Sequence, residues 1–128
     1  MEYNLLQYAY IGDAIYEVLV RDYLLSKNIV KTKELREKSL LFVSAIKQAY
    51  FLVVLSNGFL NDDELDIVRK GRNAKVHSKP KNCDILTYKY ATSFEVLIGF
   101  LYKNNNYDRI KEIFDEIVKE VEGVNEVC

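Results

Sequence analysis

The sequence predicts an all-α protein. Chain-breaking residues are rare among its 128 residues, with one proline and five glycines. Apolar residues recur with the spacing of helix faces, and no segment shows the alternation of apolar and polar residues that is typical of a half-buried strand. A chain of this length can bury one core and has little room for a second folded module. We therefore expect a single domain over residues 1–128.

Two helices and a core segment are expected in the first half of the chain. Residues 5–25 form the first helix, and Ser26-Lys27-Asn28 ends it. Thr32 is a candidate N-cap for the second helix, and the apolar, aromatic run over residues 44–55 is expected to cross the core. The expected buried stripe of the first helix has the spacing i, i+3, i+4, i+7, i+8. It consists of Ile11, Ala14, Ile15, Val18 and Leu19.

Three further helices are expected over residues 61–70, 84–102 and 107–122. Asn61 followed by Glu64 fits the start of the first of these, because this spacing resembles a capping box. Residues 71–83 are expected to form a loop, since they contain Gly71 and Pro80. The inward face of the last helix is expected to consist of Ile110, Ile113, Phe114, Ile117 and Val121.

The composition excludes several classes of protein. Hydrophobic residues make up 49% and charged residues 29%, an ordinary globular balance, and no apolar stretch is long enough to span a bilayer. The N-terminus lacks the features of a signal peptide, so we expect a cytoplasmic protein. The two cysteines have no metal-binding or disulfide-scaffold spacing. A net charge of −1 argues weakly against a nucleic-acid partner unless the cations gather on one face.

Asp13 is the first candidate for chemistry. It follows Gly12 within a strongly apolar helix, and a glycine leaves room for another backbone or a ligand. A carboxylate at that position can bind a cation or cap a neighbouring helix. The alternative is a solvated helix edge on which Glu17 pairs with Arg21 four residues later. The residues alone favour this alternative.

Glu95 is the second candidate. It is the only charged residue from Ala91 to Tyr102, and a carboxylate in an apolar helix is costly unless it is paired or binds a metal. Gly99 follows one turn later on the same side. The alternative is one exposed position on an otherwise buried helix, and the residues favour neither. Two carboxylates from two helices can hold Mg²⁺ with several waters, but the sequence does not show that Asp13 and Glu95 meet.

A basic segment covers residues 69–81. It contains six Lys or Arg residues and no acid, a concentration that suits electrostatic binding of a phosphate backbone. The only histidine, His77, also lies in this segment. We expect it to contact a phosphate or to have no role in the reaction, and not to act as a catalytic base. Composition alone slightly favours the alternative of a solvated basic loop.

Three segments together resemble the ribonuclease III family, and in particular its compact branch, Mini-ribonuclease III. They are Ala-Tyr-Ile-Gly-Asp-Ala-Ile-Tyr-Glu at residues 9–17, Gly-Arg-Asn-Ala-Lys at residues 71–75, and Tyr-Ala-Thr-Ser-Phe-Glu-Val-Leu-Ile-Gly at residues 90–99. Their order and spacing agree with the family, and the likeness covers nearly the whole chain. Each segment alone is a weak to moderate signal, whereas the three together are a strong one.

The resemblance implies a helical bundle of the ribonuclease III endonuclease type that works as a homodimer and cleaves double-stranded RNA with Mg²⁺. Asp13 and Glu95 match the two metal-binding, catalytic carboxylates of the family. Larger members carry further acids where this chain has Ala9 and Thr92, which leaves two carboxylates per centre. The products would be a 5′-phosphate and a 3′-hydroxyl.

The resemblance also implies that the chain has no double-stranded-RNA-binding domain, so the catalytic domain itself would bind the RNA. The expected RNA contacts are Arg69, Arg72, Asn73, Lys75, Lys79 and Lys81. The substrate implied is large-subunit (23S) ribosomal RNA precursor, whose ends the enzyme would mature with help from a large-subunit ribosomal protein. The alternatives are an inactive ribonuclease III-like module that binds RNA or scaffolds a ribosomal particle, and a helical protein-interaction domain with an incidental basic loop.

Overall fold

A computed structural model describes residues 2–75 and 83–123, and within these ranges the chain is helical and contains no strand, as predicted. Six helices are present in the described residues. They are α1 (Leu5–Leu25), α2 (Thr32–Val43), α3 (Ala45–Ser56), α4 (Asp62–Arg72), α5 (Ile85–Lys103) and α6 (Tyr107–Glu122).

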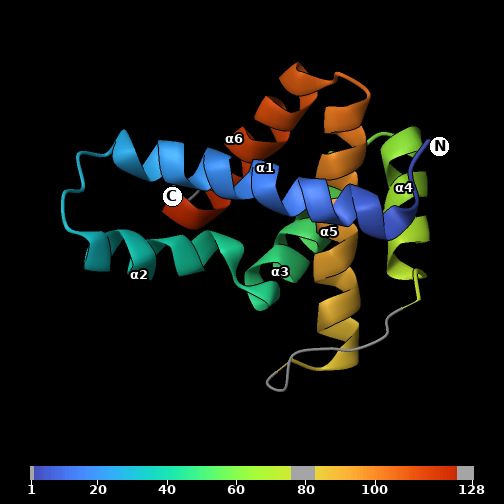
Figure 1. The fold of residues 1–128 in the computed structure, drawn as a ribbon, viewed down its shortest axis with the longest axis horizontal. Helices are drawn as coiled ribbons and strands as arrows, with labels where there is room; N and C mark the ends of the chain where they lie inside the picture. The colour runs from blue at the N-terminus through green and yellow to red at the C-terminus, as the bar shows by residue number, and fades with distance from the viewer. Residues whose placement is uncertain (1, 76–82, 124–128) are drawn as a thin grey trace.

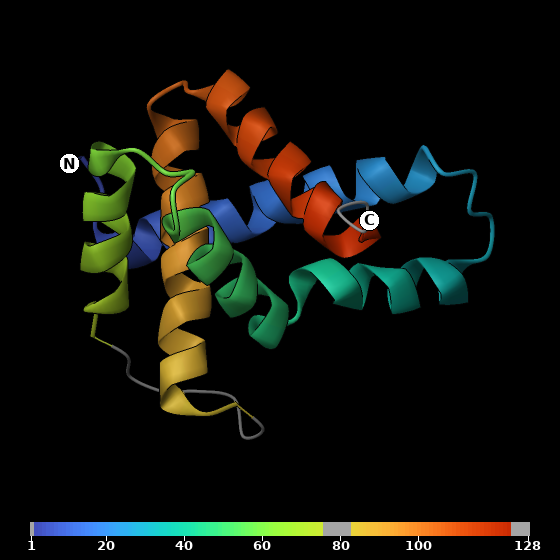
Figure 2. The ribbon, with the colours of Figure 1, turned by 180° about the vertical axis from the view of Figure 1, so that it is seen from behind.

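Helix α5 is the centre of the bundle. It packs against α1, α3, α4 and α6, and its contact with α1 is the most extensive in the molecule. Figure 1 shows α1 crossing α5, with α2 returning beside the second half of α1 and α4 standing next to α5. Seen from behind in Figure 2, α3 crosses α5 from the other side. Residues near the middle of α5 therefore lie between α1 and α3. A functional side chain on this part of α5 would be close to both neighbouring helices.

Local caps explain several helix boundaries. The capping box expected at the start of α4 is present, with the Asn61 side chain accepting from the Glu64 backbone N–H and the Glu64 side chain accepting from the Asn61 backbone N–H. The N-cap expected at Thr32 is wrong by one residue, because Lys31 holds that position and makes no side-chain cap. Ser44 separates α2 from α3 by taking an extended conformation and accepting from the Lys47 backbone N–H.

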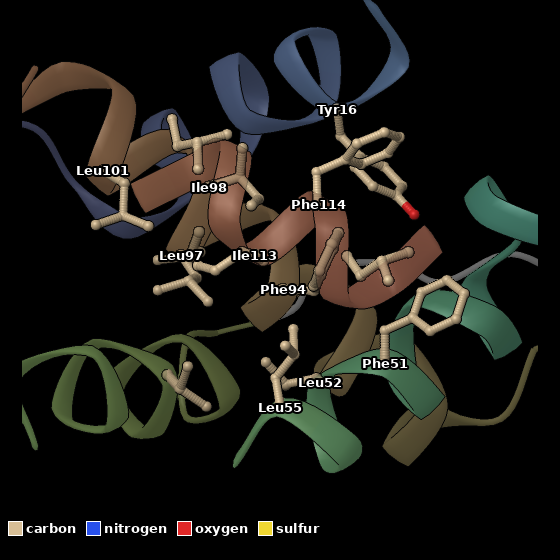
Figure 3. Packing of buried hydrophobic residues seen from close by; sticks show 14 of the residues in the cluster. Tyr16, Phe51, Leu52, Leu55, Phe94, Leu97, Ile98, Leu101, Ile113 and Phe114 are labelled. Carbon is tan, nitrogen blue, oxygen red and sulfur yellow. The ribbon is translucent and has the colours of Figure 1, made fainter. Parts of the chain in front are cut away.

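Aliphatic and aromatic side chains fill the core between the helices, and Figure 3 shows Tyr16, Phe94 and Phe114 grouped within it. Tyr16 packs edge-to-face on Phe94 with ring centroids 4.8 Å apart. Its hydroxyl donates to the backbone carbonyl of Phe42 at 2.8 Å, so the buried polar atom is satisfied. The Tyr16 side chain of α1 therefore contacts both α2 and α5.

The buried face of α1 differs from the predicted stripe. Val18 and Ala14 are exposed, and Ile11, Ile15 and Leu19 are only partly buried. The reason is that α5 packs closely against a different face of α1, on which the small residues Ala9 and Gly12 lie between large side chains. The buried residues of α1 are Tyr8, Ala9, Gly12, Tyr16, Val20 and Leu24. The face predicted for α6 is confirmed for four of its five residues, and Val121 is partly buried.

Helix α4 is longer than predicted. The expected loop began at Gly71, but α4 continues through Arg72. Gly71 is buried against α5, where an added Cβ would lie 3.0 Å from Ser93 Cα. The Ser93 hydroxyl also donates to the Val68 carbonyl at 2.6 Å. The end of α4 is therefore held on α5, and tertiary contact overrides the helix-breaking tendency of glycine.

No single helix in the described ranges is long and apolar enough to cross a membrane, although α2 and α3 together, bent by 44° at their junction, pass that test by length and composition.

Candidate active site

Two glycines bring the backbones of α1 and α5 into contact. A Cβ added to Gly12 would lie 2.8 Å from Gly99 N and 2.9 Å from the Glu95 carbonyl carbon, and closer still to the Glu95 carbonyl oxygen. A Cβ added to Gly99 would lie 2.7 Å from the Tyr8 carbonyl carbon. Real side chains do not tolerate such distances, so both positions require glycine for packing. The crossing point of the two helices is therefore adjacent to Asp13 and Glu95.

The structure brings the Asp13 and Glu95 side chains together. Asp13 is exposed on α1, and Glu95 is partly buried on α5. The pKa of Glu95 is raised to about 8, first by its burial and then by the negative charge of Asp13 and a hydrogen bond with the Asp13 side chain. The two carboxyl groups therefore meet at the crossing of α1 and α5.

Two more polar side chains belong to this cluster. Gln48 on α3 is buried, hydrogen-bonds to Glu95 and thereby opposes the rise in its pKa. Its amide nitrogen also donates to the Val43 carbonyl at 3.3 Å. Glu17 raises the Glu95 pKa through its charge, and it also forms the predicted pair with Arg21, at 3.3 Å. Sequence reasoning missed Gln48, although a glutamine inside the apolar run of residues 44–55 was a possible signal.

The chemistry of this cluster suits a hard cation. In the residues that the structure describes, no group of three or more His, Cys, Asp or Glu side chains could hold a metal. The candidate donors are therefore limited to a pair, and Asp13 and Glu95 are the pair that meets at the crossing of α1 and α5. Ala9 and Thr92 are buried and offer no further carboxylate. A divalent cation between Asp13 and Glu95 would offset both the burial and the repulsion from Asp13 that raise the Glu95 pKa. The two carboxylates therefore fit a small metal centre that completes its shell with water.

The basic segment begins on the last turn of α4. Arg69 and Lys70 both pair with Asp66, at 2.6 and 3.1 Å, so much of their charge is locally compensated. Arg72 lies over the Tyr90 ring on α5, 5.6 Å from its centroid, and its Nη1 donates to the Tyr90 hydroxyl at 3.4 Å. The Arg72 Nε is buried and has no hydrogen-bond partner among the described residues.

The remaining predicted contacts divide into two groups. Asn73 is the C-cap of α4, and Lys75 is exposed just beyond it. Lys79, Lys81 and His77 lie outside the described residues. Ser93, which lies two residues before Glu95 on α5, bonds to Val68 on α4. Helix α5 therefore positions both the basic end of α4 and the carboxylate pair.

The chain is similar to known proteins over nearly its whole length. The ribonuclease III domain family matches residues 6–106. A Mini-ribonuclease 3 of Brevibacillus brevis is 43% identical over 120 residues, which cover 94% of this chain and 89% of the relative. A Mini-ribonuclease 3 of Enterococcus faecalis is 40% identical over 96% of this chain and 94% of its own length. A crystal structure of a Fusobacterium nucleatum protein superposes with a TM-score of 0.84 at 28% identity, covering 92% of this chain and 95% of that one.

Proposed function

This chain belongs to the ribonuclease III family and is an endoribonuclease, and we propose that it cleaves double-stranded RNA at a centre formed by Asp13 and Glu95. The observation that carries the proposal is the meeting of these two carboxylates where α1 crosses α5. They come from segments distant in sequence, and two touching glycines hold them in place. The products would be a 5′-phosphate and a 3′-hydroxyl.

The family generally uses a divalent metal, and we propose Mg²⁺ for this chain. Asp13 and Glu95 would hold it, because carboxylate oxygens are ligands that Mg²⁺ prefers and it keeps several waters of its own. When bound, such an ion acidifies a water and stabilises the charge that develops on the phosphoryl oxygens. Two protein carboxylates satisfy this requirement without the acids that larger members carry at the positions of Ala9 and Thr92.

The side chains around the carboxylates have distinct tasks in this proposal. Gln48 orients Glu95 through their hydrogen bond, and its own position is fixed by the Val43 carbonyl. Glu95 must release its proton before it can bind a cation, because its pKa is about 8. Asp13, exposed beside it, supplies a carboxylate on the side from which a bulky RNA can approach.

The basic end of α4 would bind the RNA backbone. Among the described residues, Arg72 and Lys75 are the members of this segment that form no ion pair, so they have the most charge to offer to phosphates. Arg69 and Asn73 would add weaker contacts, and we extend the proposal to Lys79 and Lys81 on sequence alone. An A-form duplex is recognised mainly by shape and backbone, so sequence preference should be modest. All these contacts come from the catalytic domain itself.

Members of the family commonly act as dimers, and we propose that this chain forms a homodimer. The outer face of α1 supports this, because it exposes three large apolar side chains that project from one side of the helix. Tyr10, Val18 and Leu25 are 85%, 56% and 57% exposed. Two centres related by a twofold axis would cut both strands of one duplex.

The substrate proposed is large-subunit (23S) ribosomal RNA precursor, matured at its ends in the cytoplasm with help from a large-subunit ribosomal protein. The support is the similarity to bacterial Mini-ribonuclease 3 proteins over nearly the whole chain. A precursor transcript whose ends form a duplex is the natural probe for this part of the proposal.

Cleavage of duplex RNA in Mg²⁺ tests the catalytic centre. Asp13→Asn and Glu95→Gln should each abolish cleavage while circular dichroism shows an intact fold, and Glu37→Gln, an exposed acid on α2, should cleave like the unaltered protein. Cleavage that survives in Asp13→Asn or Glu95→Gln would refute the assignment. Unaltered protein that binds duplex RNA without ever cutting it would favour the scaffold alternative.

The salt dependence of RNA binding tests the basic segment. Neutralising Arg72 and Lys75 together should lower the slope of log K against log salt by about one unit or more. Lys31→Gln with Lys33→Gln, two exposed cations at the start of α2, is the matched control. An equal change in both double variants would show that net charge, and not this segment, governs binding.

A further inference from the structure

A groove runs between the second half of α1 and α6, with a volume of about 640 Å³. Its floor is apolar, formed by Ile15 and Leu19 from α1 and by Phe114 and Val118 from α6. All of these except Phe114, which is buried, are only partly buried. The groove therefore presents an apolar surface that no other part of the described chain covers.

Tyrosine rings border this floor. Tyr23 lines it from α1 and Tyr102 and Tyr107 line it from the junction of α5 and α6, where their ring centroids lie 5.5 Å apart. Tyr107 is 54% exposed. Rings in this setting offer apolar area together with faces that attract cations.

Three aspartates line the same groove. They are Asp22 on α1 and Asp108 and Asp115 on α6, opposed by a single cation, Lys111. None of the three forms an ion pair with any described residue. In a chain with a net charge of −1, this gathers unpaired negative charge around an apolar floor.

The groove lies on the opposite flank of α1 from the carboxylate pair. Asp13 and Asp22 are nine residues apart, which is about two and a half helical turns, so their side chains leave opposite sides of the helix. Phosphates are repelled by the three aspartates, which excludes RNA as the occupant. A ligand here would leave the approach to Asp13 open.

We propose that this groove binds a protein segment in which basic and apolar side chains alternate. Its apolar side chains would fill the floor, and its Lys or Arg side chains would reach the aspartates and the tyrosine faces. This proposal is independent of RNA cleavage, because the residues that line the groove include neither Asp13 nor Glu95 nor any residue of α4.

A fluorescent synthetic peptide in which lysine alternates with leucine is the probe. It should bind the whole protein, and binding should weaken as salt is added. Replacing all three groove aspartates with asparagine should raise the Kd about tenfold, because each lost carboxylate accounts for a few-fold in affinity. The matched control replaces exposed acids elsewhere with their amides, and it should change the Kd less than about twofold. Its substitutions are Glu34→Gln, Glu37→Gln and Asp63→Asn.

Additional binding measurements test whether the peptide occupies this groove. Peptides with glutamate for lysine, or serine for leucine, should fail to bind, and Tyr107→Ala should weaken binding of the original peptide. Saturating duplex RNA should leave the peptide affinity unchanged, since the two surfaces lie on opposite flanks of α1. Equal weakening in the groove and control variants, or displacement of the peptide by RNA, would overturn the proposal. So would a dimer that dissociates when the three aspartates are replaced, because the occupant would then be a second copy of the chain.

Discussion

Gly12→Ala is the substitution that most directly tests the helix crossing beneath the candidate active site. Gly12 sits one residue before Asp13 and touches the backbone of α5 at Glu95 and Gly99. The substitution adds one methyl group and no charge. Any effect on activity must therefore come from moving α1 against α5.

The structure sets the size of this effect. The new Cβ would lie 2.8 Å from Gly99 N and 2.9 Å from the Glu95 carbonyl carbon, whereas carbon contacts are comfortable at about 3.5 Å. The Glu95 carbonyl oxygen would lie closer still, so the helices must separate by about 1 Å or more at their crossing. Overpacking of this kind costs about 1–3 kcal/mol and sometimes more, and both clashing partners are backbone atoms that cannot rotate away. This clash with fixed backbone therefore belongs at the upper end of that range, about 3 kcal/mol, and because alanine returns about 1 kcal/mol through its helix propensity, we expect a net loss of about 2 kcal/mol.

The loss in activity should exceed the loss in stability. A shift approaching 1 Å between catalytic groups can cost about a hundredfold in rate. Urea unfolding measures the first quantity, and duplex-RNA cleavage at a temperature where the variant remains folded measures the second. Ala14→Gly, at an exposed position on the same helix, is the control for propensity and should lose about 1 kcal/mol with little change in cleavage.

A Gly12→Ala protein as stable and active as the unaltered one would refute the close crossing of α1 and α5. A variant that is destabilised but cleaves at the normal rate would refute the link between this crossing and the alignment of Asp13 with Glu95. Gly99→Ala provides an independent check, because its Cβ would meet the Tyr8 backbone from the opposite helix.

Three further predictions concern the same framework. The Glu95 pKa of about 8 lies above the usual 4.5, so in EDTA the contribution of Glu95 to stability should be complete below about pH 4.5 and lost as the pH rises through 8, a change of a few kcal/mol. Urea unfolding should show this loss of stability, and a Glu95→Gln protein with the same pH profile would contradict the prediction. Glu64→Gln should lower the free energy of unfolding by about 3 kcal/mol, because Arg109 on α6 donates to both Glu64 carboxylate oxygens, at 2.8 and 2.9 Å. A double-mutant cycle with Arg109→Met that gives a coupling energy near zero would disprove this role. Ser93→Ala should cost about 1 kcal/mol by removing the 2.6 Å bond to the Val68 carbonyl and should weaken RNA binding through the end of α4; unchanged affinity would separate α4 docking from RNA binding.

Local information accounts for what could be predicted. Periodicity placed the helices, and the Asn61–Glu64 capping box marked the start of α4, because caps depend on residues three positions apart. The apolar surroundings of Glu95 and the glycine beside Asp13 marked both as candidates. These signals need no knowledge of the partner helix.

Contacts between distant segments decided the features that the sequence misjudged. The buried face of α1 follows from the backbone contact at Gly12 and Gly99, which a count of apolar residues cannot detect. Gly71 suggested a loop, yet it is helical because Ser93 lies against it. The link from Gln48 to Glu95 joins α3 to α5 and has no local signature.

By itself, the sequence determined that the protein is a bundle of helices and where most of those helices begin, and it was the resemblance to the ribonuclease III family, more than local chemistry, that singled out Asp13 and Glu95. These properties depend on residues within a few positions of one another. Only the tertiary structure decided that Asp13 and Glu95 meet and that the aspartates of α1 and α6 border one groove. The angle and closeness at which helices cross are set by many side chains at once, and the glycines at the crossing of α1 and α5 act only when both helices are in place.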